Sequence, residues 1–191
     1  MSDFSIVSSV IKNRRSTKPA AMNGGKIPDE QVMQLLELAD WAPTHGFTEP
    51  WRFTVYANPA DFCNQHAELY KQNTSTEDFN ETTYNNFYNQ GNKVSHVIVA
   101  VMKRGDLPKI PAFEEIAAAS AAIQNLLLGA TALNIASFWS TGGMILKAAM
   151  KQFLNLRDED EVMGVLYLGY ADEHPAGVRK TPLSEKITWI Q

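Results

Sequence analysis

The chain has 191 residues, of which 45% are hydrophobic and 20% charged, values that are ordinary for a soluble globular protein. The 17 lysines and arginines against 21 acidic residues give a formal net charge of −4, so nothing global favours nucleic acid or an anionic membrane. The length is most simply one domain, residues 1–191, and the single cysteine excludes an intramolecular disulfide. Polar Ser2 and Asp3 stand where a signal peptide has a basic start and a long apolar run, so we expect a cytoplasmic protein.

The first half of the sequence predicts two short helices and one strand. Asp3 can cap a first helix whose apolar residues repeat at helical spacing: Phe4, Ile6, Val7, Val10 and Ile11. Pro28 suits the start of a second helix, since proline is tolerated in a first turn, and this helix ends before Pro43. A loop rich in proline, glycine and aromatic residues follows. Alternating β-branched and aromatic residues then predict a strand over 52–57.

The second half is organised around a helix predicted over 111–133. Glu114 and Glu115 suit its positive N-terminus, and no charged residue follows until Lys147, so we expect the helix to be buried in a core or an interface. We reject a membrane span, because polar residues interrupt the segment and basic anchors are missing from its flanks. Further strands are predicted at 96–102, 135–139 and 162–170, with a helix inside 141–153.

Two other segments are defined by their composition. Residues 59–92 are rich in asparagine, glutamine, tyrosine and threonine, and we expect them to be helical in part and mobile. Residues 181–191 read as an extended tail that ends in apolar side chains: Ile187, Trp189 and Ile190. Apolar residues at a chain terminus need a place to be buried, and a partner subunit is the natural one.

The strongest local charge anomaly is a basic cluster after the first helix. It contains four cations with no acid between Asp3 and Asp29: Lys12, Arg14, Arg15 and Lys18. Arginine can bind a phosphate with two parallel hydrogen bonds, and the hydroxyls of Ser16 and Thr17 would complete an anion site. Arg179 and Lys180 could reach the same anion if the fold brings the chain ends together. The alternative is a solvated turn at a helix C-terminus, where cations are favoured anyway.

Other kinds of chemistry have less support in the residues. No serine-hydrolase, P-loop or Rossmann motif occurs, and the four scattered histidines with one cysteine make no metal-binding pattern. His45 could act as an acid or base, but with no fixed carboxylate beside it a hydrogen-bonding role is commoner. Cys63 could be activated near a helix start, although an incidental small apolar residue is the simpler reading. A nucleic-acid-binding module would explain the basic cluster but not the acidic total.

Five short motifs, taken in chain order, resemble the FMN-dependent nitroreductase family in its compact, short-chain branch. They are Arg14-Arg15-Ser16, Ala42-Pro43-Thr44-His45 leading to residues 49–53, Trp139-Ser140-Thr141-Gly142, the strand 164–169, and residues 179–183. Each motif alone is weak evidence for the family, but five motifs in the same order along the chain are more specific. The resemblance implies an α+β fold with a central mixed or antiparallel sheet flanked by helices. It also implies an intertwined homodimer with FMN at the interface and C-terminal tails that reach across the partner.

The residues that the resemblance assigns to FMN fall into three groups. One would hold the phosphate, the ribityl chain and a ring edge: Arg14, Arg15, Ser16, Lys18, and Arg179 or Lys180. A second comprises a loop supplied by the partner and the turn before the first long strand: Trp41, Thr44, His45, Pro50 and Trp51. The third lies along the flavin: Trp139, Ser140, Thr141 and Gly142. Glu49 and Ser140 depart from the family pattern, which leaves substrate and cofactor preference open.

The implied activity is ping-pong hydride transfer from NADH or NADPH to FMN and on to a nitroaromatic, a quinone or a similar small electrophile, with no essential acid or base in the protein. Two alternatives share the same motifs. One is a flavin-dependent dehydrogenase or dehalogenase of a specific metabolite, and the other is a non-catalytic FMN-binding protein. Neither nucleic acid nor a membrane is expected as a partner.

Overall fold

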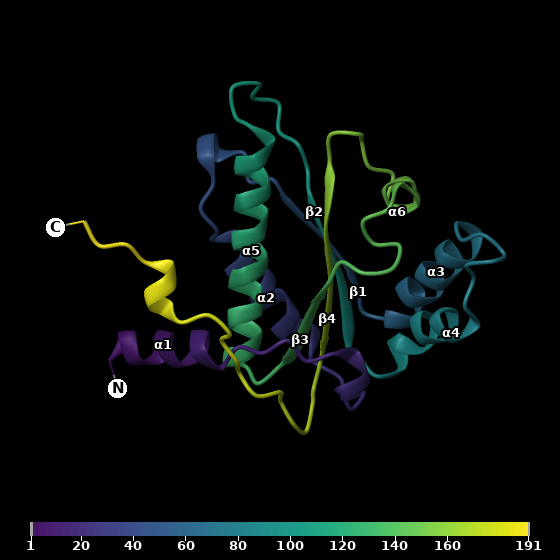
Figure 1. Ribbon diagram of the computed structural model, residues 1–191, viewed down its shortest axis with the longest axis horizontal. Helices are drawn as coiled ribbons and strands as arrows, with labels where there is room; N and C mark the ends of the chain where they lie inside the picture. Colours follow the sequence, from purple (N-terminus) through teal and green to yellow (C-terminus); the bar gives the residue numbers. More distant parts are fainter. Residues whose placement is uncertain (1, 191) are drawn as a thin grey trace.

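Four antiparallel strands form the centre of the chain (Figure 1). In the computed structural model, which describes residues 2–190, they are β1 (Trp51–Tyr56), β2 (His96–Met102), β3 (Ala136–Ser140) and β4 (Glu161–Gly169). Their order across the sheet is β1-β2-β4-β3, and every neighbouring pair is antiparallel. The four predicted strands are therefore confirmed to within a residue or so, and the sheet is antiparallel rather than mixed.

Helices cover both faces of this sheet, which confirms the α+β class. The helices α2 (Asp29–Asp40) and α5 (Ala112–Ala132) lie on one face, and α3 (Pro59–Gln72) and α6 (Ala148–Phe153) lie on the other (Figure 1). Alternate residues of β2 enter the two cores, Ile98 toward α5 and Val99 toward α3. A strand covered on both sides has no face for water, which explains its unbroken apolar run.

The helix α5 is the long buried element that the sequence predicts. Two glutamates occupy its first turn, and nine of its residues are buried. At Gly129 a Cβ atom would lie 2.6 Å from Leu38 Cδ1, so the missing side chain lets α2 approach closely. Within residues 2–190 no helix has both the length and the apolar content needed to cross a membrane.

The polar segment 59–92 is helical in part, as expected. The helix α4 (Glu81–Asn89) packs on α3 through aromatic rings, and the short 3-10 turn Gln90–Asn92 follows it. Between β3 and α6 the predicted helix is shorter than expected, because residues 141–147 form turns. Gly143 has a φ of +63°, a left-handed conformation that a helix does not use.

Both chain ends lie on the same side of the molecule (Figure 1). The helix α1 (Asp3–Asn13) is capped by Ser2, one residue before the expected Asp3, and none of its residues is buried. After β4 the tail projects away from the body, and all of residues 172–190 are exposed. Trp189 is 84% exposed and Ile190 is 94% exposed. Further 3-10 turns occur at Pro19–Ala21, His45–Phe47 and Leu183–Lys186.

Candidate functional site

Lys12 of the basic cluster lies in the last turn of α1, and the other three cations lie on the irregular segment 14–18, which runs along the start of β3. The Thr17 backbone N–H donates to the Ser137 carbonyl at 2.9 Å, and the Thr17 side chain is buried. The Arg14 guanidinium donates to Ser16 Oγ at 3.5 Å, so these two side chains lie together. Lys18 lines a cavity further along the segment. The segment therefore offers a cation beside a hydroxyl, and a second cation at the cavity.

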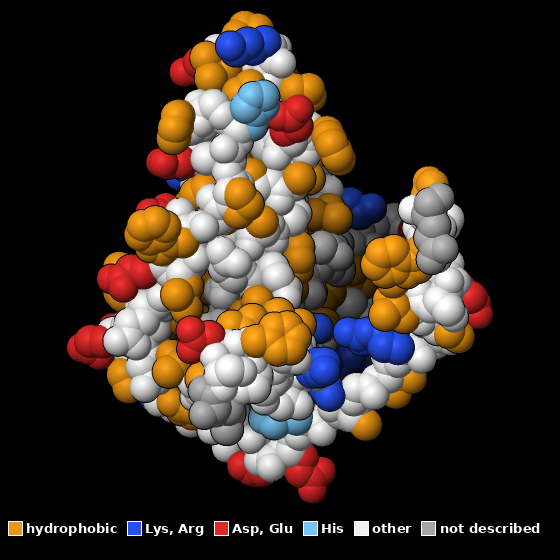
Figure 2. Space-filling model, turned by 90° about the vertical axis from the view of Figure 1, so that its left-hand side faces the viewer, with side chains coloured by type: hydrophobic (Ala, Val, Ile, Leu, Met, Phe, Trp, Pro, Cys, Tyr) orange, Lys and Arg blue, Asp and Glu red, His pale blue; other side chains and the backbone are white. Residues whose placement is uncertain are grey.

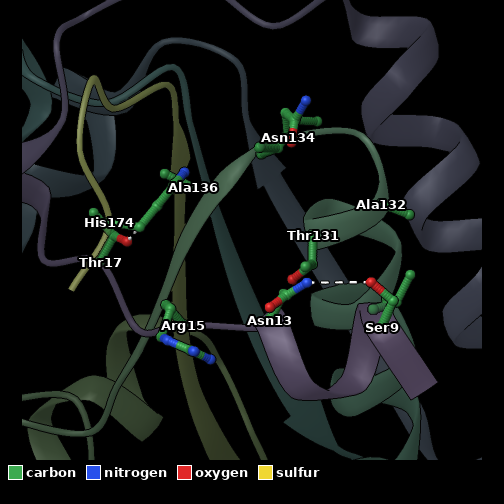
Figure 3. Close-up of a pocket in the computed structure, with 11 residues that line it drawn as sticks. Ser9, Asn13, Arg15, Thr17, Thr131, Ala132, Asn134, Ala136 and His174 are labelled. Carbon is green, nitrogen blue, oxygen red and sulfur yellow. Dashed lines mark hydrogen bonds between the residues drawn. The ribbon is translucent and has the colours of Figure 1, made fainter. Parts of the chain in front are cut away.

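Arg15 fastens the base of the tail. Its Nη1 donates to the carbonyls of Lys12 at 2.7 Å and Arg14 at 2.9 Å, and its Nε donates to the Pro175 carbonyl at 3.1 Å. Close by, Thr17 Oγ1 lies 3.3 Å from His174 Nδ1 (Figure 3). These contacts join the segment after α1 to the start of the C-terminal tail. Arg179 and Lys180 could reach the anion bound by the basic cluster only if the fold brought these two parts of the chain together.

Arg179 and Lys180 follow this anchor point on the tail, and both are exposed. Figure 2 shows Lys and Arg side chains gathered in a hollow beside the projecting tail. A smaller polar cavity of about 280 Å³ lies between α1, the end of α5 and the tail (Figure 3), with Asn13 and Thr131 pointing toward one another from the two helices. Arg15 thus fastens the base of the tail segment that carries Arg179 and Lys180.

On the Lys18 side, a cavity of about 510 Å³ opens toward α4. Apart from Lys18 and the Pro19–Ala20 turn, the lining comes from α4, the residues after it and β3: Asn85, Asn86, Asn89, Gln90, Lys93 and Phe138. The volume is typical of small-molecule sites, which span about 300–1,000 Å³. Side-chain amides both donate and accept hydrogen bonds, so this wall suits the edge of a planar polar heterocycle.

Sequence reasoning missed the α4 wall, because it treated 59–92 only as a polar segment. A signal was present, since Asn85, Asn86 and Asn89 repeat at spacings of three and four, which places amides on one side of a helix.

Neighbouring residues at the end of β3 face opposite sides of the sheet. Trp139 packs on the α5 side of the sheet, where its Nε1 donates to the Met163 carbonyl at 2.8 Å, while Phe138 on the opposite side lines the 510 Å³ cavity. Gly164 makes room for the indole, because a Cβ there would lie 2.3 Å from Trp139 Nε1. Ser140 Oγ accepts from the Gly142 N–H at 3.4 Å, and Thr141 and Gly142 are exposed. Of this segment, Phe138 lines the cavity, whereas the Trp139 indole packs toward α5 and Thr141 lines a separate pocket with Ile116 and Met163.

The loop after α2 is held by its own side chains. Thr44 Oγ1 lies 3.0 Å from Thr48 Oγ1 and accepts from the Glu49 N–H at 3.2 Å. Phe47 and Glu49 have φ values of 54° and 40°, a strained conformation for residues with side chains. His45 Nδ1 lies 2.5 Å from Glu114 Oε2. The sequence showed no carboxylate fixed near His45, and the start of α5 supplies one.

The neighbouring aromatic residues differ sharply in exposure. Trp41 is 86% exposed and lines an apolar groove of about 350 Å³ between α1, α2 and α5. Pro50 and Trp51 are buried at the start of β1, and Trp51 Nε1 donates to Asp40 Oδ1 at 2.9 Å. Trp51 therefore belongs to the core that supports the loop, whereas Trp41 stands free for a contact outside the chain.

One chain does not bring all the predicted site residues together. His45 contacts Glu114 at the start of α5, while Arg15 lines a cavity with Thr131 near its end. Residues 114 and 131 are separated by roughly 26 Å along the helix at about 1.5 Å per residue. The Thr44–His45 loop and the basic segment therefore lie at opposite ends of the same helix.

Two titratable groups lie in the core beside α4. Burial raises the pKa of the Cys63 thiol to about 12, so it is inert, which agrees with the simpler reading of this residue. Burial lowers the pKa of His66 to about 4, so its ring is neutral near pH 7. Among residues 2–190 no group of histidine, cysteine and acidic side chains is placed to hold a metal ion.

Comparison with known proteins places this geometry in a family. A Bacillus subtilis protein provisionally named as an NAD(P)H nitroreductase, YfhC, is 28% identical over 187 residues, which is 96% of this chain and 94% of that protein. A nitroreductase-like protein of Bacillus cereus has a crystal structure that matches with a TM-score of 0.85 at 25% identity, covering 100% of this chain and 99% of that one.

A second solved structure shares the fold at lower identity. It is a nitroreductase with bound FMN from Bacteroides fragilis, with a TM-score of 0.69 at 23% identity, covering 97% of this chain and 98% of that one. The nitroreductase family model itself matches residues 11–170, from the end of α1 to the end of β4. The chain is therefore a member of the nitroreductase family.

Proposed function

We propose that this protein is an FMN-dependent NAD(P)H oxidoreductase that acts as a homodimer. One observation carries the proposal: the segment from Arg14 to Lys18 holds three cations and leads into a cavity lined by Lys18, amides and Phe138. FMN has those two parts, a doubly charged phosphate and a planar polar ring. The FMN held by the Bacteroides fragilis neighbour, and the NAD(P)H in the name of the Bacillus subtilis relative, support it.

The residues present fit this cofactor. Arg14 and Ser16 are placed to donate to the phosphate, and Arg15 holds the tail so that Arg179 or Lys180 can add a further charge. Lys18 and the α4 amides are placed to donate to the ring edge, where they would stabilise negative charge.

When bound, FMN accepts hydride from NADH or NADPH and delivers it to a second substrate such as a nitroaromatic or a quinone, which gives ping-pong kinetics. This chain's residues orient the cofactor and the substrates, and none needs to act as an acid or base. Glu114 holds the His45 ring through Nδ1, and the role proposed for His45 is still contact, because hydride transfer through FMN needs no acid or base from the protein. A flavin-dependent dehydrogenase or dehalogenase of one metabolite would use the same arrangement, and so would a non-catalytic FMN-binding protein.

The homodimer accounts for two features of the single chain. The Thr44–His45 loop lies roughly 26 Å from the basic segment along α5, so a partner must supply the loop if both belong to one site. Trp41, Leu38 and the outer face of α1 leave an apolar groove open to solvent, and the tail carries Trp189 and Ile190. Burial of these surfaces against a second copy would remove them from water. We therefore propose that the tail reaches the partner subunit.

The first test is a visible absorbance spectrum of the purified protein, followed by addition of NADH or NADPH without oxygen. Flavin bands that bleach on addition, and return with a quinone or nitroaromatic, are the expected result. A coloured protein that neither nicotinamide bleaches would instead support the non-catalytic alternative. A protein that remains colourless after reconstitution with FMN would refute the proposal.

A hybrid dimer tests whether two chains share each site. Arg14→Ala should inactivate the site that uses its own basic segment, and Thr44→Glu should inactivate the site that uses its loop. If the sites are shared, a mixed dimer of the two variants contains one site with both parts intact, and FMN binding returns at about half the occupancy. If each chain binds FMN alone, mixing restores nothing.

A further inference from the structure

His66 lies in the core between three elements. It belongs to α3, is 2% exposed, and stacks on Phe87 of α4 with the ring centroids 4.3 Å apart. Its Nε2 accepts from the Met144 backbone N–H at 3.1 Å. A ring nitrogen that accepts from an N–H carries no proton, so the proton of the neutral ring is on Nδ1. Within residues 2–190 this buried Nδ1 has no hydrogen-bond partner.

The loop after β3 is pressed against the same two rings. At Gly143, whose φ is +63°, a Cβ atom would lie 2.7 Å from Phe87 Cζ and 2.8 Å from His66 Nε2. The backbone can make this approach only without a side chain. The turn at 141–147 is thus fixed by ring contact at Gly143 and by one hydrogen bond at Met144.

These contacts join two walls of the candidate cofactor cavity. Phe87 is on α4, the helix that carries the amide wall with Asn86 and Asn89, and the loop continues directly from β3, whose Phe138 forms the opposite wall. His66 itself does not line the cavity. It contacts α4, which carries the amide wall, and the loop that continues from the strand carrying Phe138.

We propose that His66 is a positioning residue, which fixes the spacing between the α4 wall and the loop after β3 and thereby sets the affinity of the cavity for the flavin ring. The proposal rests on the proposed function, because it places the flavin in this cavity. An apolar ring at this position would avoid the unpaired Nδ1, but it would leave the Met144 N–H without its acceptor. The imidazole is the ring that supplies both the stack and the acceptor.

The test compares FMN affinity in three variants of the full-length protein. His66→Phe keeps a ring and removes the acceptor, while His66→Gln retains an acceptor through its amide oxygen. Ile123→Ala serves as a destabilised control, because Ile123 is fully buried on the opposite face of the sheet. FMN dissociation constants come from fluorescence titration, and hydrogen exchange reports the Met144 amide.

We expect His66→Phe to weaken FMN binding by up to about tenfold, because binding must then restore a wall spacing that one buried hydrogen bond held in the parent, and to speed exchange at Met144. His66→Gln should stay within about threefold of the parent, and Ile123→Ala should lose stability without losing FMN affinity. Gly143→Ala provides a second perturbation from the loop side, and it should also weaken binding, because its Cβ displaces both rings.

The proposal is overturned if His66→Phe and Gly143→Ala bind FMN as tightly as the parent, or if Ile123→Ala weakens binding equally. Should His66→Phe not fold, Gly143→Ala decides by the same comparison. A parent chain that binds no FMN refutes the proposed function itself. Normal binding by the parent together with unaffected variants removes only the role of His66.

Discussion

Acid should destabilise this protein through His66 as the pH falls below about 6.5. Burial lowers the pKa of His66 from 6.5 to about 4. Between these two values the unfolded chain binds a proton at His66 and the folded chain does not. Stability therefore falls as pH drops through this window, since protons favour the state that binds them.

The magnitude follows from the shift. A displacement of about 2.5 pKa units corresponds to about 3 kcal/mol at about 1.4 kcal/mol per unit. His66 makes this contribution in full only above the unfolded pKa, and the contribution has disappeared near pH 4. Asp160 acts in a lower range, because the Arg157 guanidinium and backbone N–H groups hold the pKa of its carboxyl below its usual value although burial opposes this.

The assay is urea unfolding of the parent and of His66→Gln from about pH 7 to about pH 4, at one FMN concentration, because bound ligand adds to stability. Glutamine does not titrate, so the parent should lose about 3 kcal/mol more than the variant across this range. All other groups titrate in both proteins and cancel in the difference. Parallel profiles, or a His66 signal that titrates near 6.5 in NMR, would refute the reasoning.

Four further substitutions test individual contacts. Arg14→Ala should reduce FMN affinity with little change in stability, whereas Arg15→Ala should also cost about 1–2 kcal/mol, because three carbonyls lose a charged donor; equal unfolding midpoints would contradict this separation. His45→Ala should keep substantial turnover, and a collapse of the rate with flavin retained would assign it proton transfer. Gly164→Ala should lower stability by about 1–3 kcal/mol, because its φ is +135° and the new Cβ meets Trp139; thermal unfolding unchanged from the parent would show that the indole moves freely.

Helices and strands could be predicted from the sequence where the hydrophobic pattern of neighbouring residues defines them. The strand β2 was predicted with its observed bounds from a run in which six of its seven residues are apolar, and α5 was predicted to within one residue at each end. Both depend on hydrophobic runs that neighbouring residues define. The sequence predicted a helix that included residues 144 and 146, where the structure has a turn. The backbone at Gly143 lies against the rings of His66 and Phe87, which belong to α3 and α4, and the residues of the turn carry no sign of that contact.

The candidate site divides in the same way. Motif order alone indicated the family, and local charge indicated the Arg14–Lys18 segment, since both are properties of consecutive residues. The roles of individual side chains could not be predicted from the sequence, because their partners lie far away in the chain. Arg15 is engaged by a carbonyl 160 positions away, and His45 by a carboxylate 69 positions away. A contact across such a separation leaves no mark on the residues beside it.

By itself, then, the sequence determined the strands, the buried central helix and the kinship of the chain, because burial and propensity act over a few residues. Only the tertiary structure decided that the amides of α4 face Lys18, that Trp139 points away from the cavity, and that the two ends of the chain meet at Arg15. The physical reason is that side-chain direction depends on which layers pack together, and packing is a property of the whole chain.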